Sequence, residues 1–296
     1  MAKSVLKRLA SPMYEKFWVA FNNRLPHIPS ITGKFFPYDV HAKSFVIERV
    51  DLASTEMAEP GLPAPIHDFQ RRHNPNGLKD YLETGKRDWT AMMKILGDAG
   101  FTLQDGMRVL DFGCSTARIL RYFKDDAQRV EFWGVDIHAG DIAWCKTHLS
   151  PPFKFATTTT LPHLPFEDNR FNFIYAGSLF THIDDQADSW FLELRRVLAP
   201  GGYLYVTVHD NHSIELLSTT HSSHPMAKAL AANEQYNAYL KRPFAMFTID
   251  RSMGSQVFYD RDWLLQELGR AYEVVSVTDE AYAGFQTGIL LRKPLA

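Results

Sequence analysis

The chain is poor in cysteine and has no long hydrophobic run. Its 296 residues include two cysteines, Cys114 and Cys145. Two scattered thiols are too few for a disulfide scaffold or a cysteine-ligated metal site, so a reducing cytoplasm is the expected compartment. No apolar stretch approaches the roughly 20 residues that span a bilayer, and the N-terminus lacks the apolar segment of a signal peptide. These absences predict a soluble, cytoplasmic protein.

The chain also lacks an excess of charge of one sign. The formal net charge is -2, whereas a protein that wraps nucleic acid needs a clustered basic surface, so no nucleic-acid partner is expected. The first 34 residues do hold six lysines and arginines against one acid, Glu15. This segment reads either as a basic stretch that touches an anionic membrane surface or as the solvated face of an ordinary helix. We favour the solvated face.

Two regions differ in their pattern of apolar residues. Residues 1–75 are dotted with proline and aromatic side chains and predict an extension that packs against a core. Residues 76–296 begin with a helical pattern from 77 to 100 and then alternate short apolar runs with helical segments. That alternation is typical of a doubly wound α/β fold with a parallel sheet. The predicted strands are residues 108–112, 131–137, 153–157, 171–177 and 201–208, and the helices between them are residues 116–123, 140–148 and 184–198.

The alternation breaks after His209. Residues 211–256 read as helical segments with polar joints, and we interpret them as an insertion that forms a lid over the substrate. The alternation resumes with a helix over 260–270 and two strands, 272–278 and 288–293. The predicted core therefore carries a helical insertion near its C-terminal end.

The loop after the first predicted strand has fewer glycines than a dinucleotide site requires. In VLDFGCSTAR, residues 109–118, Gly113 is followed by Ser115 and Arg118 at the positions of the second and third glycines of G-x-G-x-x-G. A pyrophosphate needs those glycines for its close approach to the helix start, so NAD and FAD are disfavoured. A nucleoside without phosphates makes a smaller demand on this loop.

Asp136 ends the second predicted strand, 25 residues after Asp111. An acid about 20 residues past such a loop accepts hydrogen bonds from both ribose hydroxyls, because a carboxylate offers two oxygens to a diol. Asp136 is thus a candidate ribose ligand, the alternative being a cap on the next helix. S-adenosylmethionine, which has a ribose diol, an ammonium, a carboxylate and a sulfonium, meets these demands.

The segments VLDFGCSTAR, GVDI, LPHLPFEDNRFNFIYAGSLFTHI and LRRVLAPGGYLYVTV resemble, in order and spacing, the motifs of class I S-adenosylmethionine-dependent methyltransferases. The resemblance covers residues 107–208, and more loosely the last helix and strand pair. It implies a Rossmann-like sheet of seven strands with the last strand antiparallel, and S-adenosyl-L-methionine as cofactor across the carboxyl ends of the first strands.

The resemblance also implies a set of cofactor contacts. Asp111, Phe112, Gly113 and Cys114 correspond to the loop around the methionine end, and Asp136 to the ribose acid. Ile137 is similar to the apolar residue on the adenine. The family often has an acid near Leu161, which is absent here, with Thr160 as a substitute. Gly177 and Ser178 end the fourth strand, where the family's backbone passes the methionine moiety. Ser115 and Ala117 replace the family's further glycines.

Two histidines are candidates for acid–base chemistry. His182 follows the fourth predicted strand and His209 ends the fifth, so both fall at the carboxyl edge of the sheet. Either one is a general base for a hydroxyl or amine acceptor, or a histidine held by backbone hydrogen bonds. The run His209–His212 has metal-ligating residue types, but neighbours on a strand point to opposite faces, so no metal site is expected.

The preferred interpretation is an enzyme that transfers a methyl group from S-adenosylmethionine to a small-molecule hydroxyl or amine, such as a sugar, a lipid-linked compound or a secondary metabolite. The alternative is a non-catalytic scaffold or regulatory relative, suggested by the glycine-poor loop. A nicotinamide-dependent oxidoreductase is disfavoured by the same loop. The oligomeric state cannot be inferred from the sequence.

Overall fold

The computed structural model describes residues 52–55, 57–66, 77–241, 245–249 and 255–295. They include a seven-stranded sheet with the order β3-β2-β1-β4-β5-β9-β8. The strands are β1 (Arg108–Phe112), β2 (Glu131–Asp136), β3 (Lys154–Thr157), β4 (Phe171–Ala176), β5 (Leu198–Val208), β8 (Glu273–Tyr282) and β9 (Gln286–Arg292). β1 to β5 pair in parallel, and β9 runs antiparallel to both β5 and β8. The predicted doubly wound sheet with an antiparallel last strand is confirmed.

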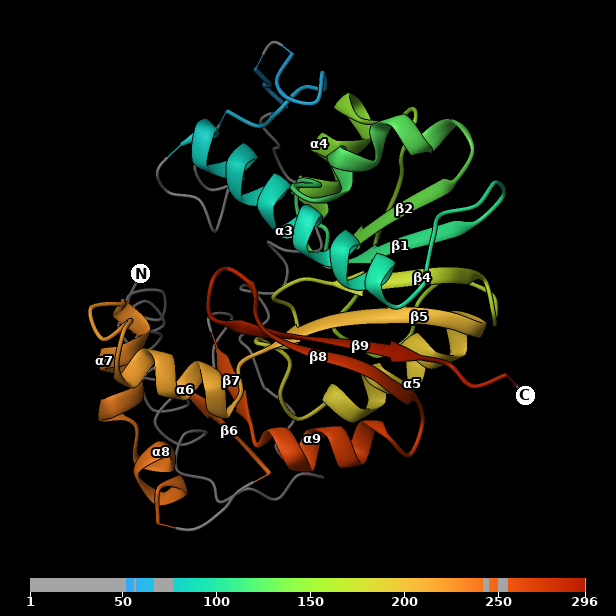
Figure 1. The fold of residues 1–296 in the computed structure, drawn as a ribbon. Coiled ribbons are helices and arrows are strands. Elements are labelled where there is room, and N and C mark those ends of the chain that lie inside the picture. The colour runs from blue at the N-terminus through green and yellow to red at the C-terminus, as the bar shows by residue number, and fades with distance from the viewer. Residues whose placement is uncertain (1–51, 56, 67–76, 242–244, 250–254, 296) are drawn as a thin grey trace, which may run out of the picture.

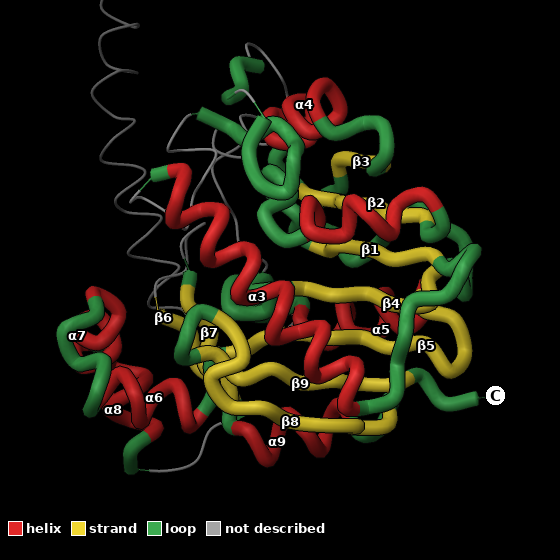
Figure 2. Tube along the Cα trace, turned by 45° about the horizontal axis from the view of Figure 1, so that its top comes forward, coloured by secondary structure: helices red, strands yellow, loops and turns green. Residues whose placement is uncertain are grey.

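Helices cover both faces of this sheet, because successive strand residues point to opposite faces and both sets are apolar. Val109 of β1 packs in the core beneath the helices α3 (Leu78–Asp98), η2 (Leu120–Gln128) and α4 (Ala139–His148). Leu110 packs in the core beneath α5 (Ala187–Val197) and α9 (Arg261–Leu268). Figures 1 and 2 show α3 crossing one face while α5 and α9 lie behind the other.

The strand order reverses at β1. The chain moves from β1 to β2 and β3 on one side, and then returns to place β4 and β5 on the other. In open α/β sheets, ligands bind beyond the carboxyl ends of the strands at such a reversal. The loops after β1, β2, β4 and β5 therefore define the edge where a site is expected.

The segment after β1 differs from its prediction. A helix was expected over residues 116–123, but turns precede a 3₁₀ helix, η2, that begins at Leu120. Ser115 and Ala117 have φ angles of 46° and 63°. A right-handed helix needs negative φ, so these two residues delay its start.

The insertion was expected to consist of helical segments, but its described part is only partly helical. α6 (Asn211–Ser218), α7 (Pro225–Ala232) and α8 (Glu234–Tyr239) are followed by a two-stranded sheet of β6 (Met246–Ile249) and β7 (Gln256–Tyr259). The short apolar run of β6 pairs with β7, and Phe247 stacks on Phe258 with ring centroids 5.2 Å apart. In Figure 1 this insertion lies at the left, beyond the carboxyl ends of the parallel strands.

Part of the N-terminal extension is described. Residues 57–66 pack on η2, where the buried Arg121 donates to the backbone carbonyls of Glu59, Leu62 and Pro63. The basic first 34 residues and the other expectations for residues 1–51 and 67–75 lie outside the described residues. Within the part of the chain that is described, no helix combines the length and apolarity needed to cross a bilayer.

Candidate functional site

In the loop after β1, residues other than glycine also adopt the backbone angles that glycine favours. Gly113 has a φ of 88°, and Ser115 and Ala117 also lie in the left-handed region. This region costs a residue with a Cβ about 1–2 kcal/mol, so packing around the loop must offset that strain. Ser115 and Ala117 therefore change the amino-acid composition of the loop more than its backbone conformation.

Backbone hydrogen bonds dock this loop on the end of β2. The N–H groups of Gly113 and Cys114 both donate to the Val135 carbonyl, at 2.8 and 3.0 Å. The Ser115 N–H donates to Oδ2 of Asp136 at 2.8 Å, and the Ser115 hydroxyl to Asp141 at 3.2 Å. The loop and the β2 acid thus form one unit.

Asp136 is a buried carboxylate with acceptor capacity left over. Its Oδ1 accepts from the His138 N–H at 2.8 Å, in addition to the bond from Ser115. α4 begins at Ala139, and His138, not Asp136, occupies its N-cap position. Each carboxylate oxygen has two lone pairs, so both oxygens retain a position for a hydroxyl donor.

Asp111 is more deeply buried than Asp136, and the pKa of its carboxyl is strongly shifted. Burial raises its pKa to about 7, against a lowering effect of the hydrogen bond from the Tyr175 hydroxyl. That hydroxyl donates to Oδ2 at 2.9 Å. A cation beside Asp111 would favour its ionised form, so this carboxyl is suited to a positively charged ligand.

Arg118 connects three distant segments near Asp111. Its Nη2 lies 2.8 Å from Oδ2 of the buried Asp88 on α3, and it also donates to the Tyr282 hydroxyl at the end of β8. Its Nη1 is buried and has no hydrogen-bond partner. A buried guanidinium donor without a partner suits an anionic group such as a carboxylate. In the sequence, Arg118 stands out only as the residue at the position of a missing glycine.

The remaining predicted cofactor residues fall into three groups. Phe112 and Cys114 have buried side chains within the two cores, so only their backbones can line the loop. Ile137 is half-buried just after β2, whereas Thr160 and Leu161 are exposed beyond β3. Thr158, two residues before the predicted Thr160, has a buried hydroxyl oxygen without a hydrogen-bond partner, and its N–H donates to the Asp136 carbonyl at 2.9 Å.

The chain is closely packed at the end of β4. A Cβ on Gly177 would lie 2.7 Å from the Tyr282 ring, so only glycine allows this approach. The next residue, Ser178, has a φ of 55° and donates its N–H to the Thr207 hydroxyl at 2.7 Å. Gln286 joins the same cluster, because it accepts from Thr207 and donates to Ser178. β4, β5 and β9 thus fix the position of Ser178.

A cavity of about 390 Å³ opens beside Ser178. Its walls come from α3, the loops after β1 and β4, the end of β5, the insertion and the β8–β9 turn. The lining residues used below are Arg118, Ser178, His182, His209, His224 and Phe285. The cavity therefore brings together both predicted catalytic histidines, and adds His224, which was not among the predicted site residues.

His182 and His209 occupy different environments in this cavity. The half-buried His182 directs Nδ1 at the Ser255 carbonyl, 2.7 Å away. His209 is stacked between Phe258 and Phe285, with centroid separations of 5.0 and 5.4 Å, and neither ring nitrogen has a hydrogen-bond partner. Burial lowers the pKa of His209 to about 3, so its ring is neutral at physiological pH and a weak base.

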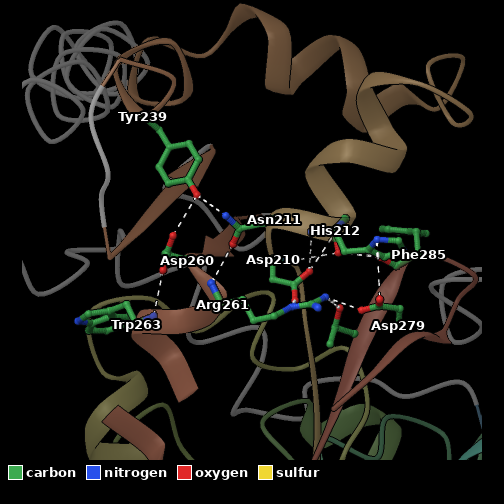
Figure 3. A network of polar contacts seen from close by, with 11 residues as sticks. Asp210, Asn211, His212, Tyr239, Asp260, Arg261, Trp263, Asp279 and Phe285 are labelled. Atoms are coloured by element: carbon green, nitrogen blue, oxygen red, sulfur yellow. Dashed lines mark hydrogen bonds and ion pairs between the residues drawn. The ribbon is translucent and has the colours of Figure 1, made fainter. Parts of the chain in front are cut away.

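Polar contacts fix the insertion to the core at its base (Figure 3). Asp210 accepts from the backbone at the start of α6 and from Nε of Arg261 at 2.6 Å. Asn211 donates to the Tyr239 hydroxyl at 2.7 Å, and that hydroxyl contacts Asp260 at 3.3 Å. α6 and α8 are thereby tied to the start of α9, which holds the insertion over the cavity.

The described residues contain no cluster of three His, Cys, Asp or Glu side chains arranged to hold a metal ion. Their polar groups do match S-adenosylmethionine. Asp136 has acceptor positions for a diol, buried Asp111 suits an ammonium, and Nη1 of Arg118 suits a carboxylate. The chemistry of this donor and acceptor set fits the cofactor.

Comparisons with known proteins agree with this geometry. Residues 110–206 match the family model of a methyltransferase domain. No curated protein matches the chain.

Two solved structures share the fold. One is a chain in the complex of the Haloferax volcanii Trm112 methyltransferase activator, with 14% identity, a TM-score of 0.52, and coverage of 77% of this chain and 96% of that one. The other is a protein from Pyrococcus horikoshii, with 15% identity, a TM-score of 0.50, and coverage of 77% and 100%. A Methanosarcina mazei S-adenosylmethionine-dependent methyltransferase is also similar, at 21% identity, a TM-score of 0.48, and coverage of 68% and 98%.

The matched domain spans β1 to β5 and carries the loop, Asp136 and the end of β4. Residues 110–206 are therefore a methyltransferase domain, as the sequence motifs predicted, and S-adenosylmethionine is the cofactor that this family implies.

Proposed function

We propose that this class I S-adenosylmethionine-dependent methyltransferase transfers the methyl group to a hydroxyl or amine of a small molecule held in the cavity beside Ser178. The observation that carries the proposal is the cavity itself, about 390 Å³ in volume, which adjoins Ser178 and Arg118 and is bordered by the insertion. A cavity of this size suits a small acceptor.

The cofactor would lie along the carboxyl edge of β1, β2 and β4. Asp136 would accept from the ribose hydroxyls, Ile137 would pack on the adenine, and Thr160 and Leu161 would lie at the adenine end. Asp111 and the loop backbone from Phe112 to Cys114 would surround the methionine end, with Gly177 and Ser178 opposite. The hydrogen bonds that join Ser115 to Asp136 support this arrangement, since they hold the loop and the ribose acid together.

Bound S-adenosylmethionine supplies a methyl group already activated by its sulfonium, so the protein's tasks are to align the acceptor and exclude water. His182 would accept the acceptor's proton at Nε2, because the Ser255 carbonyl takes a hydrogen bond from Nδ1 and thereby orients the ring. His209 would shape the cavity wall, since its neutral ring is too weak a base to remove a proton.

Calorimetry with S-adenosylmethionine and S-adenosylhomocysteine tests this proposal. Both should bind, NADH should not, and Asp136→Ala should lose at least about 100-fold in affinity, since it removes hydrogen bonds to a charged acceptor. Asp105→Ala, at a highly exposed carboxylate, is the matched control. Failure of both nucleosides to bind would instead support the scaffold alternative.

A further inference from the structure

Polar side chains from the loop after β1 and from the C-terminal hairpin meet in the cavity beside Ser178. Arg118 belongs to the loop, Tyr282 ends β8 and Gln286 begins β9. Tyr282 and Gln286 are Cα partners across the hairpin. Arg118 donates to the Tyr282 hydroxyl, and the Gln286 amide donates to the Ser178 hydroxyl at 2.9 Å. We call Arg118, Tyr282 and Gln286 the donor cluster.

Two members of the donor cluster have hydrogens without an acceptor. Nη1 of Arg118 is buried and has no hydrogen-bond partner among the described residues. The Tyr282 hydroxyl oxygen accepts from Nη2 of the same arginine, and within the described part of the chain its own hydrogen has no acceptor. Both groups are therefore available to donate to a ligand in the cavity that they line.

The orientation of the buried Gln286 amide follows from its neighbours. The Thr207 hydroxyl accepts the Ser178 N–H at 2.7 Å, so its own hydrogen has to be donated elsewhere. It is donated to Oε1 of Gln286 at 2.7 Å, which directs the amide nitrogen at the Ser178 hydroxyl. An amide nitrogen carries two hydrogens. The second one has no acceptor among the residues described, so Gln286 adds a third donor to the cavity wall.

The charge around Arg118 is only partly compensated. Oδ2 of Asp88 lies 2.8 Å from Arg118, but Oδ1 of the same carboxylate lies 3.1 Å from Arg87, so two guanidinium groups share one acid. Asp80 also lines the cavity, but it lies in the first turn of α3, about 12 Å from Asp88 along the helix axis. Asp111 interacts electrostatically with Arg118, and its pKa of about 7 leaves it partly neutral at physiological pH. The donor cluster therefore favours an anion.

We propose that the donor cluster is a carboxylate-binding site, in which Nη1 of Arg118, the Tyr282 hydroxyl and the Gln286 amide donate to the oxygens of one carboxylate. The inference rests on the proposed function and deepens it, because the cavity is the one assigned to the acceptor. The carboxylate belongs either to the methionine end of the cofactor or to the acceptor. Tyr282 and Gln286 are then specificity-determining residues that the C-terminal hairpin supplies.

Other ligand groups match the donor cluster less well. An ammonium group only donates, so it would face three donors. A neutral carbonyl accepts, but it leaves the charge of a buried guanidinium uncompensated. A phosphate monoester carries nearly two negative charges at neutral pH, more than the single positive charge of the cluster. A carboxylate has one negative charge and acceptor positions on both oxygens, so it matches both the charge and the donors.

The test uses acetate as the probe and acetamide as its neutral isostere. One sample of the full-length protein is saturated with S-adenosylhomocysteine, and another with decarboxylated S-adenosylhomocysteine, which keeps the amine. Ligand-observed NMR titration measures the affinity for each probe. In at least one sample, acetate should bind at least about tenfold more tightly than acetamide, because hydrogen bonds from a guanidinium to a carboxylate are charge-assisted.

The two samples distinguish the sources of the carboxylate. A preference for acetate only beside the decarboxylated nucleoside assigns the site to the cofactor, because acetate then fills the position of the missing carboxylate. A preference beside S-adenosylhomocysteine assigns it to the acceptor. A decarboxylated nucleoside that binds too weakly to saturate the protein also assigns the site to the cofactor if Tyr282→Phe weakens S-adenosylhomocysteine about tenfold, and overturns the inference if it does not.

Tyr282→Phe is the decisive variant, because it removes the hydroxyl and keeps the ring that packs against Gly177. Gln286→Met is the second variant, since it removes the amide but keeps the length of the side chain. Each should reduce the preference for acetate to under about threefold, because one hydrogen bond to a charged group is lost. Tyr203→Phe changes a partly buried tyrosine outside the cavity lining and should keep the preference.

Equal affinity for acetate and acetamide in both samples would overturn the inference, as would a preference that survives in both variants. Either result leaves the proposed function intact as long as the wild-type protein binds S-adenosylhomocysteine. Failure of the proposed function would appear separately, as no binding of S-adenosylmethionine or S-adenosylhomocysteine, and the inference would fail with it.

Discussion

The loop after β1 and the cavity lined by His182, His209 and His224 lie side by side at the carboxyl edge of the sheet. They differ in how far apart in the sequence their contributing residues are. The loop is local: residues 113–115 hydrogen-bond to Val135 and Asp136 on the neighbouring strand. The cavity is assembled from α3, three strand ends, the insertion and the β8–β9 turn. On the proposed function, cofactor recognition would depend on one short unit, and acceptor recognition on the relative placement of many segments.

The largest expected effect is on turnover, at the cavity. His182→Ala removes the proposed base and should lower kcat by about 10²- to 10⁴-fold, while affinity for S-adenosylmethionine stays within about threefold of wild type because the loop is untouched. Steady-state kinetics with any alcohol or amine that the protein is found to methylate, together with calorimetry, measure both. Unchanged kcat would remove His182 from the chemistry, and equal losses of kcat and cofactor affinity would contradict the separation of the two regions.

A buried ion pair joins the two regions, and breaking it should destabilise the fold. Arg118→Met leaves the carboxylate of Asp88 buried without its closest partner and should lower the free energy of unfolding by about 3 kcal/mol. Arg87→Met removes a half-exposed arginine from the same carboxylate and should lower it by under about 1 kcal/mol. Urea denaturation measures both variants. Equal losses would contradict the central role of Arg118.

Asp111 should make the free energy of unfolding depend on pH. Its pKa in the folded protein, about 7, lies above its ordinary value, so the protonated form favours folding. That contribution is complete below about pH 4 and is lost as the pH rises through 7, with a slope of at most about 1.4 kcal/mol per pH unit.

Asp111→Asn should therefore be stabilised relative to wild type at pH 8 more than at pH 5, as thermal unfolding of the cofactor-free proteins would show. Its affinity for S-adenosylmethionine should be lower and should lose the rise between pH 6 and 8 that we expect for wild type. The exposed Asp98→Asn serves as the control. Parallel pH profiles for Asp111→Asn and wild type would contradict the assignment.

The smallest expected effect is at Ser115. Ser115→Gly relieves a left-handed backbone but removes the hydrogen bond to Asp141, so stability should change by less than about 1 kcal/mol and cofactor affinity by less than about threefold. Gly113→Ala should be worse on both counts, because its Cβ would lie 2.9 Å from Leu179. A tenfold gain in affinity for Ser115→Gly would show that the glycine-poor loop is impaired.

The same contrast explains what could be predicted from the sequence. The sheet was predictable because each strand is a short apolar run buried on both faces, and Asp111, Gly113 and Asp136 end strands at fixed spacings. The start of η2 was not predictable from the sequence. Serine and alanine normally avoid left-handed φ angles, so nothing in the sequence indicates that Ser115 and Ala117 adopt them. Strands β6 and β7 were missed within a segment whose first part is helical.

The cavity was predictable only in part. His182 and His209 follow predicted strands, so their shared edge could be inferred. The pairing of Asp88 with Arg118, and the placement of His224 and Tyr282 at the same site, depend on how α3, the insertion and the last hairpin pack. No periodic pattern in the chain encodes those long-range distances.

The antiparallel β9 has a consequence for how the acceptor site can vary. Because β9 returns along β8, the two strands meet in a tight turn at the carboxyl edge, and Ala283 and Phe285 line the cavity there. A turn tolerates insertions and deletions better than a strand does. Changes in its length would reshape the cavity while the loop after β1 keeps its backbone contacts to β2. This turn is therefore the place at which to diversify acceptor choice in a library that retains the cofactor.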